Sequence, residues 1–190
     1  MDPDEPVYGE TAREMLAAGD WLSPRIFGNY WYDKPPFFYW LEMISYSLFG
    51  ATDFASRLPS ALAAMATTIY VYAAGRDIFN KPIAALSALL LVTSFGFMYI
   101  GKAAVTDMTL VLTLTVAMMS FYRKKYYTAY LFCGLSLLVK GPVGYAFPAL
   151  LMLIYIAWTR QWTLLKEMEI PQGILLAFAV GLPWYVLMYK

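Results

Sequence analysis

The chain has 190 residues, of which 61% are hydrophobic and only 14% are charged, with a formal net charge of +1. Soluble domains are about a quarter charged, so this composition indicates an integral membrane protein, and the lack of a basic tract argues against nucleic-acid binding. The sequence contains no histidine, which excludes serine–histidine nucleophilic machinery and histidine-based metal sites from this chain.

The carboxylates concentrate near the N-terminus, where nine of the thirteen acidic residues lie at or before Asp53. A first helix is expected over Pro6–Ala18, because Asp4 or Glu5 can cap its start and Gly19 can end it. Its apolar residues share one face, so this helix is predicted to lie on the bilayer surface rather than to cross it.

A second helix is expected from Pro35 to Phe49, after a loop over residues 20–33 that is rich in aromatic residues. At 1.5 Å per residue its length is about 20 Å, which is short of the roughly 30 Å hydrocarbon core. The aromatic run Phe37–Trp40 at its start is typical of a membrane-interface belt. Residues 1–54 are therefore predicted to form an outer loop with two juxtamembrane helices.

Long apolar segments follow, and they predict an all-α fold, a polytopic transmembrane helical bundle over residues 55–190. The sequence Lys140-Gly141-Pro142 suggests a break in the backbone at membrane depth, of the kind tolerated only beside protein or water. About six spans are expected: Ala55–Ala74, Pro82–Ile100, Thr106–Tyr122, Tyr126–Val139, Val143–Thr159 and Gly173–Tyr189.

The distribution of basic residues predicts the orientation of the bundle. One set of inter-span loops carries seven lysines and arginines, whereas the opposite set carries only Lys102 and Lys140. The basic set is therefore expected in the cytoplasm, which places the acidic N-terminal segment, Asp107 and Lys140 at the outer face. The basic set comprises Arg76, Lys81, Arg123, Lys124, Lys125, Arg160 and Lys166.

This orientation puts Met1 outside the membrane with no span before it, and Lys190 directly ends a predicted span. The sequence is therefore expected to be a fragment that lacks one upstream helix and an unknown length downstream.

Several short motifs resemble the first outer loop and later blocks of the protein mannosyltransferase-like membrane glycosyltransferases, a group that includes the bacterial lipid A aminoarabinose transferases. The aminoarabinose transferases commonly have arginine directly before the tyrosine of the first motif, where this sequence has Val7. The motifs occur in the family's order: Asp4-Glu5-Pro6-Val7-Tyr8, Ala12-Arg13-Glu14-Met15, Gly19-Asp20-Trp21-Leu22, Lys34-Pro35-Pro36, Arg57-Leu58-Pro59-Ser60, Thr106-Asp107-Met108 and Lys140-Gly141-Pro142-Val143-Gly144.

The resemblance implies a GT-C fold with its active site on the outer face and a donor sugar carried on a polyprenyl phosphate. It implies an acidic pair, here Asp4 and Glu5, and a lysine at the position of Lys34 that meets the donor phosphate. It also implies a protein several hundred residues long, of which this chain would be the front part.

Sugar transfer from a lipid phosphate requires a charge that stabilises the leaving phosphate and a base that activates the acceptor. Lys34 can supply the charge and Asp4 the base, while Glu5 can orient Asp4 or raise its pKa. Tyr8, Asp107 and Lys140 are candidates for the rim of the site. Neighbouring carboxylates also suit a divalent cation, so the sequence leaves open a cation site at Asp4 and Glu5.

Each candidate has a structural alternative that the sequence leaves open. Asp4 and Asp107 can cap helices, Lys34 can be a snorkelling anchor, and Lys140 can complement a helix dipole. Arg57 is expected to pair with Asp53 or with lipid headgroups.

The function predicted on these grounds is a membrane glycosyltransferase that moves a sugar from a polyprenyl-phosphate donor to a lipid or protein acceptor at the surface of the bilayer. The expected location is the bacterial inner membrane, with the site facing the periplasm. A transporter or flippase for a lipid-linked sugar is the alternative, although transporters place ionisable groups near the midplane and show internal repeats. A non-catalytic membrane scaffold is the third class.

Overall fold

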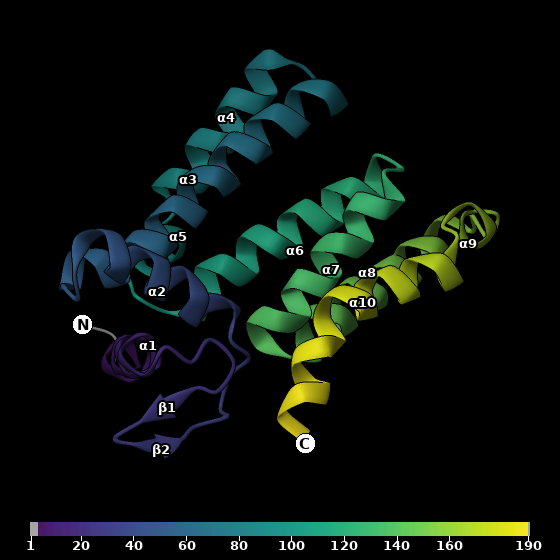
Figure 1. The fold of residues 1–190 in the computed structure, drawn as a ribbon. Coiled ribbons are helices and arrows are strands. Elements are labelled where there is room, and N and C mark those ends of the chain that lie inside the picture. Colours follow the sequence, from purple (N-terminus) through teal and green to yellow (C-terminus); the bar gives the residue numbers. More distant parts are fainter. Residues whose placement is uncertain (1–3, 190) are drawn as a thin grey trace. The chain divides into compact units, whose positions relative to one another are not determined.

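The computed structural model describes residues 4–189, and among these the chain is helical apart from short connections and one small hairpin (Figure 1). The expected all-α fold is therefore confirmed. The chain divides into two compact units, Met1–Leu112 and Thr113–Lys190.

The first unit contains one long helix, α3 of 26 residues, together with several shorter helices and a hairpin. Helix α1 packs against α2, α2 against α3 and α3 against α4. The elements are α1 (Glu5–Ala18), β1 (Arg25–Ile26), β2 (Asn29–Tyr30), α2 (Phe37–Phe49), α3 (Asp53–Ile78), α4 (Lys81–Thr93), α5 (Phe95–Ile100) and the start of α6 (Thr106–Tyr122).

The ends of α1 and α2 follow from local chemistry. Helix α1 ends at Gly19, whose φ of 65° is the left-handed conformation that glycine adopts without strain. Helix α2 begins directly after Pro36 and ends before Gly50, as predicted. Both predicted helices are confirmed, with α1 starting one residue earlier than expected, and their place at the bilayer surface stays a prediction.

The core between α1 and α2 is aromatic. Tyr8 and Met15 of α1 and Phe38, Tyr39 and Met43 of α2 are all buried there. The expectation of an aromatic belt is therefore wrong for Phe38 and Tyr39, because α1 covers the face of α2 that a belt would turn toward the headgroups.

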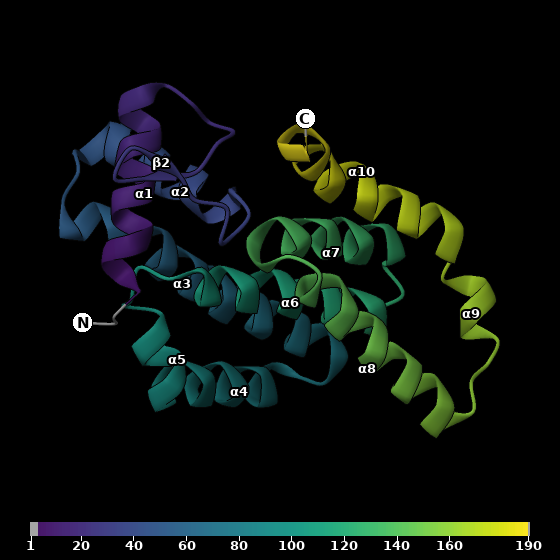
Figure 2. The ribbon, with the colours of Figure 1, turned by 90° about the horizontal axis from the view of Figure 1, so that it is seen from below.

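The second unit contains the rest of α6 and four further helices: α7 (Tyr126–Lys140), α8 (Val143–Thr159), α9 (Leu164–Glu167) and α10 (Ile170–Tyr189). Helix α7 packs against both α8 and α10 (Figure 2). Glycines permit this close packing, since a Cβ on Gly134 would lie 2.6 Å from the Ala177 carbonyl oxygen. The predicted break after Lys140 is confirmed, and Gly141 there has a φ of 71°.

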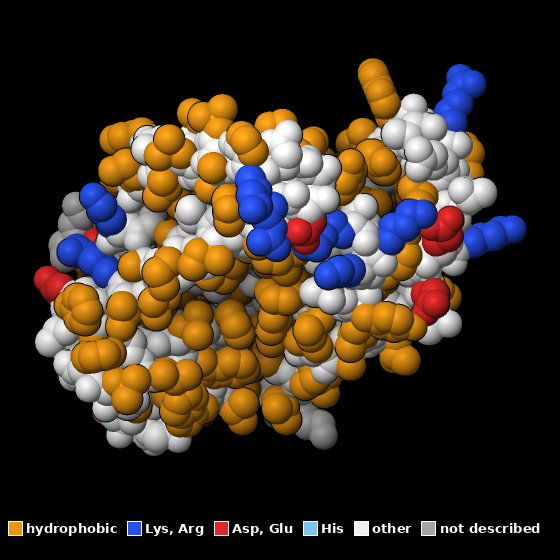
Figure 3. All heavy atoms as spheres, turned by 90° about the horizontal axis from the view of Figure 1, so that it is seen from above, with side chains coloured by type: hydrophobic (Ala, Val, Ile, Leu, Met, Phe, Trp, Pro, Cys, Tyr) orange, Lys and Arg blue, Asp and Glu red, His pale blue; other side chains and the backbone are white. Residues whose placement is uncertain are grey.

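Two of the described helices are long and apolar enough to cross a membrane: Asp53–Ile78 and Ile170–Met188. Only 33% and 22% of their apolar windows are buried, so most of each helix presents apolar side chains outward, as lipid contact requires. Hydrophobic side chains also cover much of the face shown in Figure 3. The full number of spans stays a prediction.

The predicted span Pro82–Ile100 is not one continuous helix. The chain is extended at Ser94, with a ψ of 133°, and this separates α4 from the short α5. Ser94 closes α4 with a hydrogen bond from its own hydroxyl to the Leu91 carbonyl. A serine that bonds its local backbone competes with helix continuation, which explains the break.

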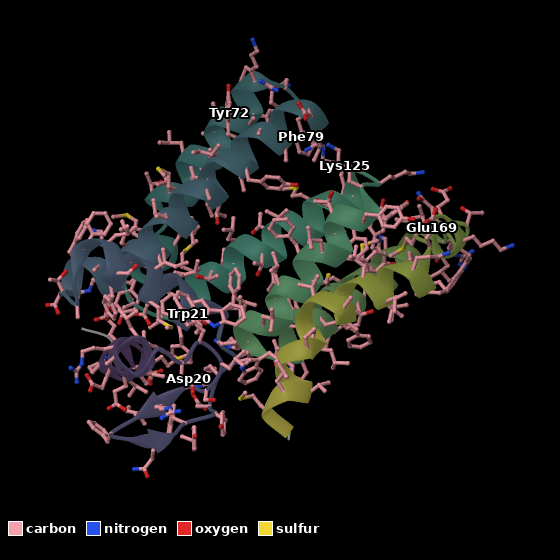
Figure 4. All side chains as sticks on the ribbon, in the orientation of Figure 1. Asp20, Trp21, Tyr72, Phe79, Lys125 and Glu169 are labelled. Atoms are coloured by element: carbon pink, nitrogen blue, oxygen red, sulfur yellow. The ribbon has the colours of Figure 1, made fainter. Side chains whose placement is uncertain are left out.

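Helix α3 separates the two ends of the first unit. Asp20 and Trp21 lie at one end of this unit, and Tyr72 and Phe79 lie at the other (Figure 4). From Arg57 to Arg76 the helix rises about 28 Å, which is close to the thickness of the hydrocarbon core. The two arginines are therefore expected at opposite membrane surfaces.

Cysteine labelling in the full-length protein tests this arrangement. Cysteine placed at the exposed Asn29 is expected to react with an impermeant thiol reagent on intact cells, whereas cysteine at the exposed Lys81 should react only after permeabilisation. The unsubstituted protein is the control. Equal reaction of both cysteines on intact cells would contradict a span-length separation by α3.

Candidate active site

The site begins with an ion pair between the buried Glu5 of α1 and the partly exposed Arg57 of α3. Arg57 donates from Nε to Glu5 Oε1 at 3.0 Å and from an Nη atom to Glu5 Oε2 at 3.1 Å. The Ala104 backbone N–H donates to the same Glu5 Oε1 at 2.8 Å, so Glu5 joins three separate segments. The carboxyl of Glu5 is buried, and its charge raises the pKa of Arg57 by hydrogen bonding.

Two expectations change because of this pair. Arg57 was expected to pair with Asp53 or with headgroups, and that prediction is wrong, since its guanidinium is bound to Glu5. A divalent cation at Asp4 and Glu5 does not fit either, because both oxygens of Glu5 accept from a permanently charged arginine. Within residues 4–189, no group of three or more acidic or cysteine side chains is arranged to hold a metal ion.

Asp4 stands directly before α1 and is exposed. Its side chain makes no capping hydrogen bond, whereas its backbone carbonyl accepts from Val7 and Tyr8. Capping by the side chain was the structural alternative for this residue, and the geometry does not support it. The carboxylate is thus positioned by the helix behind it while facing solvent.

Tyr8 lies at the point where the predicted residues of the first unit converge. Burial raises the pKa of its phenol to about 12, the neighbouring Thr106 hydroxyl opposes this shift, and the charges of Asp4, Asp33 and Asp107 add to it. Tyr8 therefore remains a neutral hydroxyl at any physiological pH, and three carboxylate charges act on it. These come from the start of α1, the loop before α2 and the first turn of α6.

Lys34 is half-buried and pairs with its neighbour Asp33, with 2.9 Å between Nζ and Oδ2. This places a cation beside one of the carboxylates whose charge acts on Tyr8. Asp33 was not singled out in the sequence, although its place directly before the lysine motif was a usable signal. Lys140 belongs to the second unit, where it is the last residue of α7.

A small hairpin is held against α1 by a carboxylate. Glu14 accepts from the backbone N–H groups of Phe27 and Gly28 at 2.7 and 2.9 Å, across the turn between β1 and β2. Asp20, directly after α1, pairs with Arg25 of β1 at 2.8 Å (Figure 4). Glu14 and Asp20 therefore hold the hairpin in place, which is a structural role, and neither is a candidate for catalysis.

Glu42 is a further residue that sequence reasoning missed. It is the sole acid in α2, and its side chain is fully buried between α2 and α3. A lone carboxyl among apolar residues near a membrane was the signal that could have identified it.

Comparisons with known proteins extend this picture. The family model described as dolichyl-phosphate-mannose-protein mannosyltransferase matches residues 33–187. An undecaprenyl phosphate-alpha-4-amino-4-deoxy-L-arabinose arabinosyl transferase from Edwardsiella ictaluri is 34% identical over 194 residues, covering 96% of this chain and 35% of the relative. A protein of the same description from Pseudomonas savastanoi is 30% identical, covering 99% of this chain and 37% of the relative.

Solved structures agree with the sequence comparisons. ArnT from Cupriavidus metallidurans bound to undecaprenyl phosphate is similar with a TM-score of 0.93 and 28% identity, covering 97% of this chain and 36% of that chain. The same protein in the apo state matches with a TM-score of 0.92 and 29% identity. The expected GT-C-like helical fold is thereby confirmed. This chain spans about a third of the length of the relatives it matches.

The ion pair of Glu5 with Arg57 predicts that substitution of Glu5 lowers the stability of the fold more than substitution of an exposed charged residue on the same helix. Glu5→Gln removes the charge that Arg57 and the Ala104 N–H share, and should cost about 1.5–3 kcal/mol, the usual range for hydrogen bonds to charged groups. The lower end applies, because the Arg57 side chain is 39% exposed and partly screened. Thermal unfolding of the full-length protein in detergent measures the effect.

Arg13→Ala provides the matched control, because Arg13 pairs with Glu10 on the outer face of the same helix. Exposed pairs of this spacing contribute little to stability, because solvent screens them. A loss of stability in Arg13→Ala equal to that in Glu5→Gln would contradict the anchoring role of Glu5.

Proposed function

Because this chain belongs to the dolichyl-phosphate-mannose-protein mannosyltransferase family, we propose that it forms part of a membrane glycosyltransferase. The enzyme would move a sugar from a polyprenyl-phosphate donor to a lipid or protein acceptor. The observation that supports the proposal is that the charges of Asp4, Asp33 and Asp107 all act on Tyr8, with Lys34 paired to Asp33. This arrangement joins an exposed base to a cation in one unit of the fold.

The proposed reaction divides between Asp4 and Lys34. The acceptor hydroxyl attacks the anomeric carbon of the sugar, its proton passes to Asp4, and the bond from that carbon to the phosphate oxygen breaks. The electron pair leaves with the phosphate, whose added negative charge Lys34 stabilises. Exposure of Asp4 suits this role, because the base must reach an incoming acceptor.

Glu5 and Tyr8 take supporting parts in this proposal. Glu5 is a positioning residue that fixes the start of α1 through Arg57 and so sets the place of Asp4. Tyr8 keeps its proton and can donate a hydrogen bond at the edge of the site. Lys140 belongs to the second unit, and its role stays a prediction.

The relatives suggest which donor to test first. Their descriptions name undecaprenyl phosphate-linked 4-amino-4-deoxy-L-arabinose. A sugar that carries an amine is cationic near neutral pH, and three carboxylates around Tyr8 would favour it over a neutral sugar. Val7, which stands where aminoarabinose transferases commonly have arginine, keeps other sugars of the family in consideration.

The site is proposed to face the periplasm at the bacterial inner membrane. The support is the exposed basic residues Arg76 and Lys81 at the far end of α3, which the charge bias assigns to the cytoplasm. The transporter alternative is less favoured, because the charged residues of α3 lie near its two ends, as Arg57 and Arg76 do, rather than at mid-helix.

Substitution of Asp4 tests the base. Asp4→Asn in the full-length enzyme keeps the size of the side chain but removes basicity, so transfer from the prenyl-phosphate donor in vesicles should fall by roughly 10²–10⁴-fold. Donor binding should remain near the wild-type level. Glu10→Gln on the same helix, whose carboxylate pairs with exposed Arg13, is the control and should be neutral. Near-wild-type turnover by a folded Asp4→Asn enzyme would overturn the assignment.

Substitution of Lys34 tests the phosphate contact. Lys34→Met retains the apolar stem and removes the charge, so both donor affinity and transfer rate should decrease, the rate by roughly 10²-fold. Titration with undecaprenyl phosphate measures the affinity. Unchanged affinity together with an unchanged rate would show that Lys34 is only a membrane anchor.

A further inference from the structure

The carboxyl of Glu42 is buried with little polar support. Its Oε1 accepts a hydrogen bond of 2.7 Å from the hydroxyl of Ser56 on α3. Its Oε2 has no hydrogen-bond partner among the residues that the structure describes. The surrounding side chains include Phe38, Tyr39 and Met43, which form the aromatic core between α1 and α2. An ionised carboxylate with one donor in such a place is costly.

The charged groups near Glu42 also oppose its ionisation. Burial is the largest effect, the charge of Glu5 on α1 adds to it, and the Ser56 hydroxyl opposes both. Together they raise the pKa of Glu42 to about 8. Arg57 follows Ser56 on α3, but its guanidinium is bound to Glu5. On α2 itself, the neighbouring Tyr46 has its own pKa raised by burial.

Ser56 lies where all three helices of the site meet. Its hydroxyl donates to Glu42 on α2, and a Cβ built on Gly9 of α1 would lie 3.3 Å from the same oxygen. The Tyr46 hydroxyl donates to the Gly9 carbonyl at 3.4 Å, so α1 approaches closely here because Gly9 has no side chain. The position of Ser56 is therefore coupled to that of α1.

We propose that Glu42 is a positioning residue, which in its neutral form holds Ser56 and thereby fixes the turn of α3 that presents Arg57 to Glu5. This inference rests on the proposed function, because the contact of Arg57 with Glu5 fixes the start of α1, and Asp4 precedes that start. Ionisation of Glu42 adds a second negative charge beside Glu5 in a buried space. The ionised carboxylate then competes for the Arg57 guanidinium or draws in water, and either change displaces Ser56 from α1.

The pH dependence follows from the direction of the shift. The folded protein keeps the Glu42 proton up to about pH 8, whereas the unfolded chain loses it near 4.5. The unfolded state thus binds fewer protons between these values, so the stability contributed by Glu42 falls as pH rises from about 4.5 to about 8 and is constant above. Transfer should decline above pH 8 as the ionised form accumulates.

Glu42→Gln in the full-length protein tests the proposal, because glutamine has the shape of the neutral acid and cannot ionise. The melting temperature of the variant relative to wild type should rise progressively from pH 5 to pH 8. Asp53→Asn, at an exposed position of the first turn of α3, is the control and should not show this trend. If the melting temperatures of Glu42→Gln and wild type depend on pH identically, the claim that folded Glu42 is neutral below about pH 8 is wrong.

Transfer activity provides the second readout. Wild-type transfer should fall by roughly tenfold per pH unit above 8, and Glu42→Gln should keep its neutral-pH rate through pH 9, below the usual pKa of lysine near 10.4. Ser56→Ala should lower the rate at neutral pH, because the link to Arg57 is lost. If the sugar-transfer rates of Glu42→Gln and wild type depend on pH in the same way, the positioning role is refuted, even if the melting temperatures of the two proteins differ as predicted.

These outcomes separate failure of this proposal from failure of the proposed function. The stability measurement does not depend on sugar transfer, so it remains decisive if no transferase activity is found. A Glu42→Gln protein that fails to fold at pH 6 would itself contradict the proposal, since an amide and a neutral acid should then be interchangeable.

Discussion

The pairing of Glu5 with Arg57 is the interaction on which the first unit depends, because it is where three segments of the chain meet. Glu5 belongs to α1, Arg57 to α3, and the Ala104 N–H to the loop before α6. A buried carboxylate is stable only when paired and hydrogen-bonded, so the three segments must be assembled together. The placement of Asp4, one residue before Glu5, follows from this constraint.

The polar groups of the site are held in a setting that is otherwise apolar. Tyr8 is buried among Phe38 and Tyr39, yet the charges of three carboxylates act on it. Surface helices of this kind cover apolar side chains on one face and leave their acidic residues at the water-facing edge. The same packing that shields the core therefore brings the start of α1, the loop before α2 and the start of α6 to one place.

How much of this could be predicted depends on the range of the interaction. The ends of α1 and α2 follow from proline and glycine in the neighbouring sequence, and both were predicted to within one or two residues. The partner of Arg57 could not be predicted, since Asp53 is one helical turn away and Glu5 is 52 residues away. The hairpin was missed because its strands have two residues each, and its turn uses Phe27 at a φ of 51° instead of the usual asparagine.

The environments of three carboxyls explain how one acidic segment can support different tasks. Asp4 is exposed, Glu5 is buried with a compensating arginine, and Glu42 is buried with a single hydroxyl. An exposed carboxylate such as Asp4 is available as a base. The charge of Arg57 favours the ionised form of Glu5, and burial with a single hydroxyl partner favours the neutral form of Glu42. Because the charge of Glu5 opposes ionisation of Glu42, we propose that the neutral state of one supports the paired state of the other and that the placement of Asp4 depends on both.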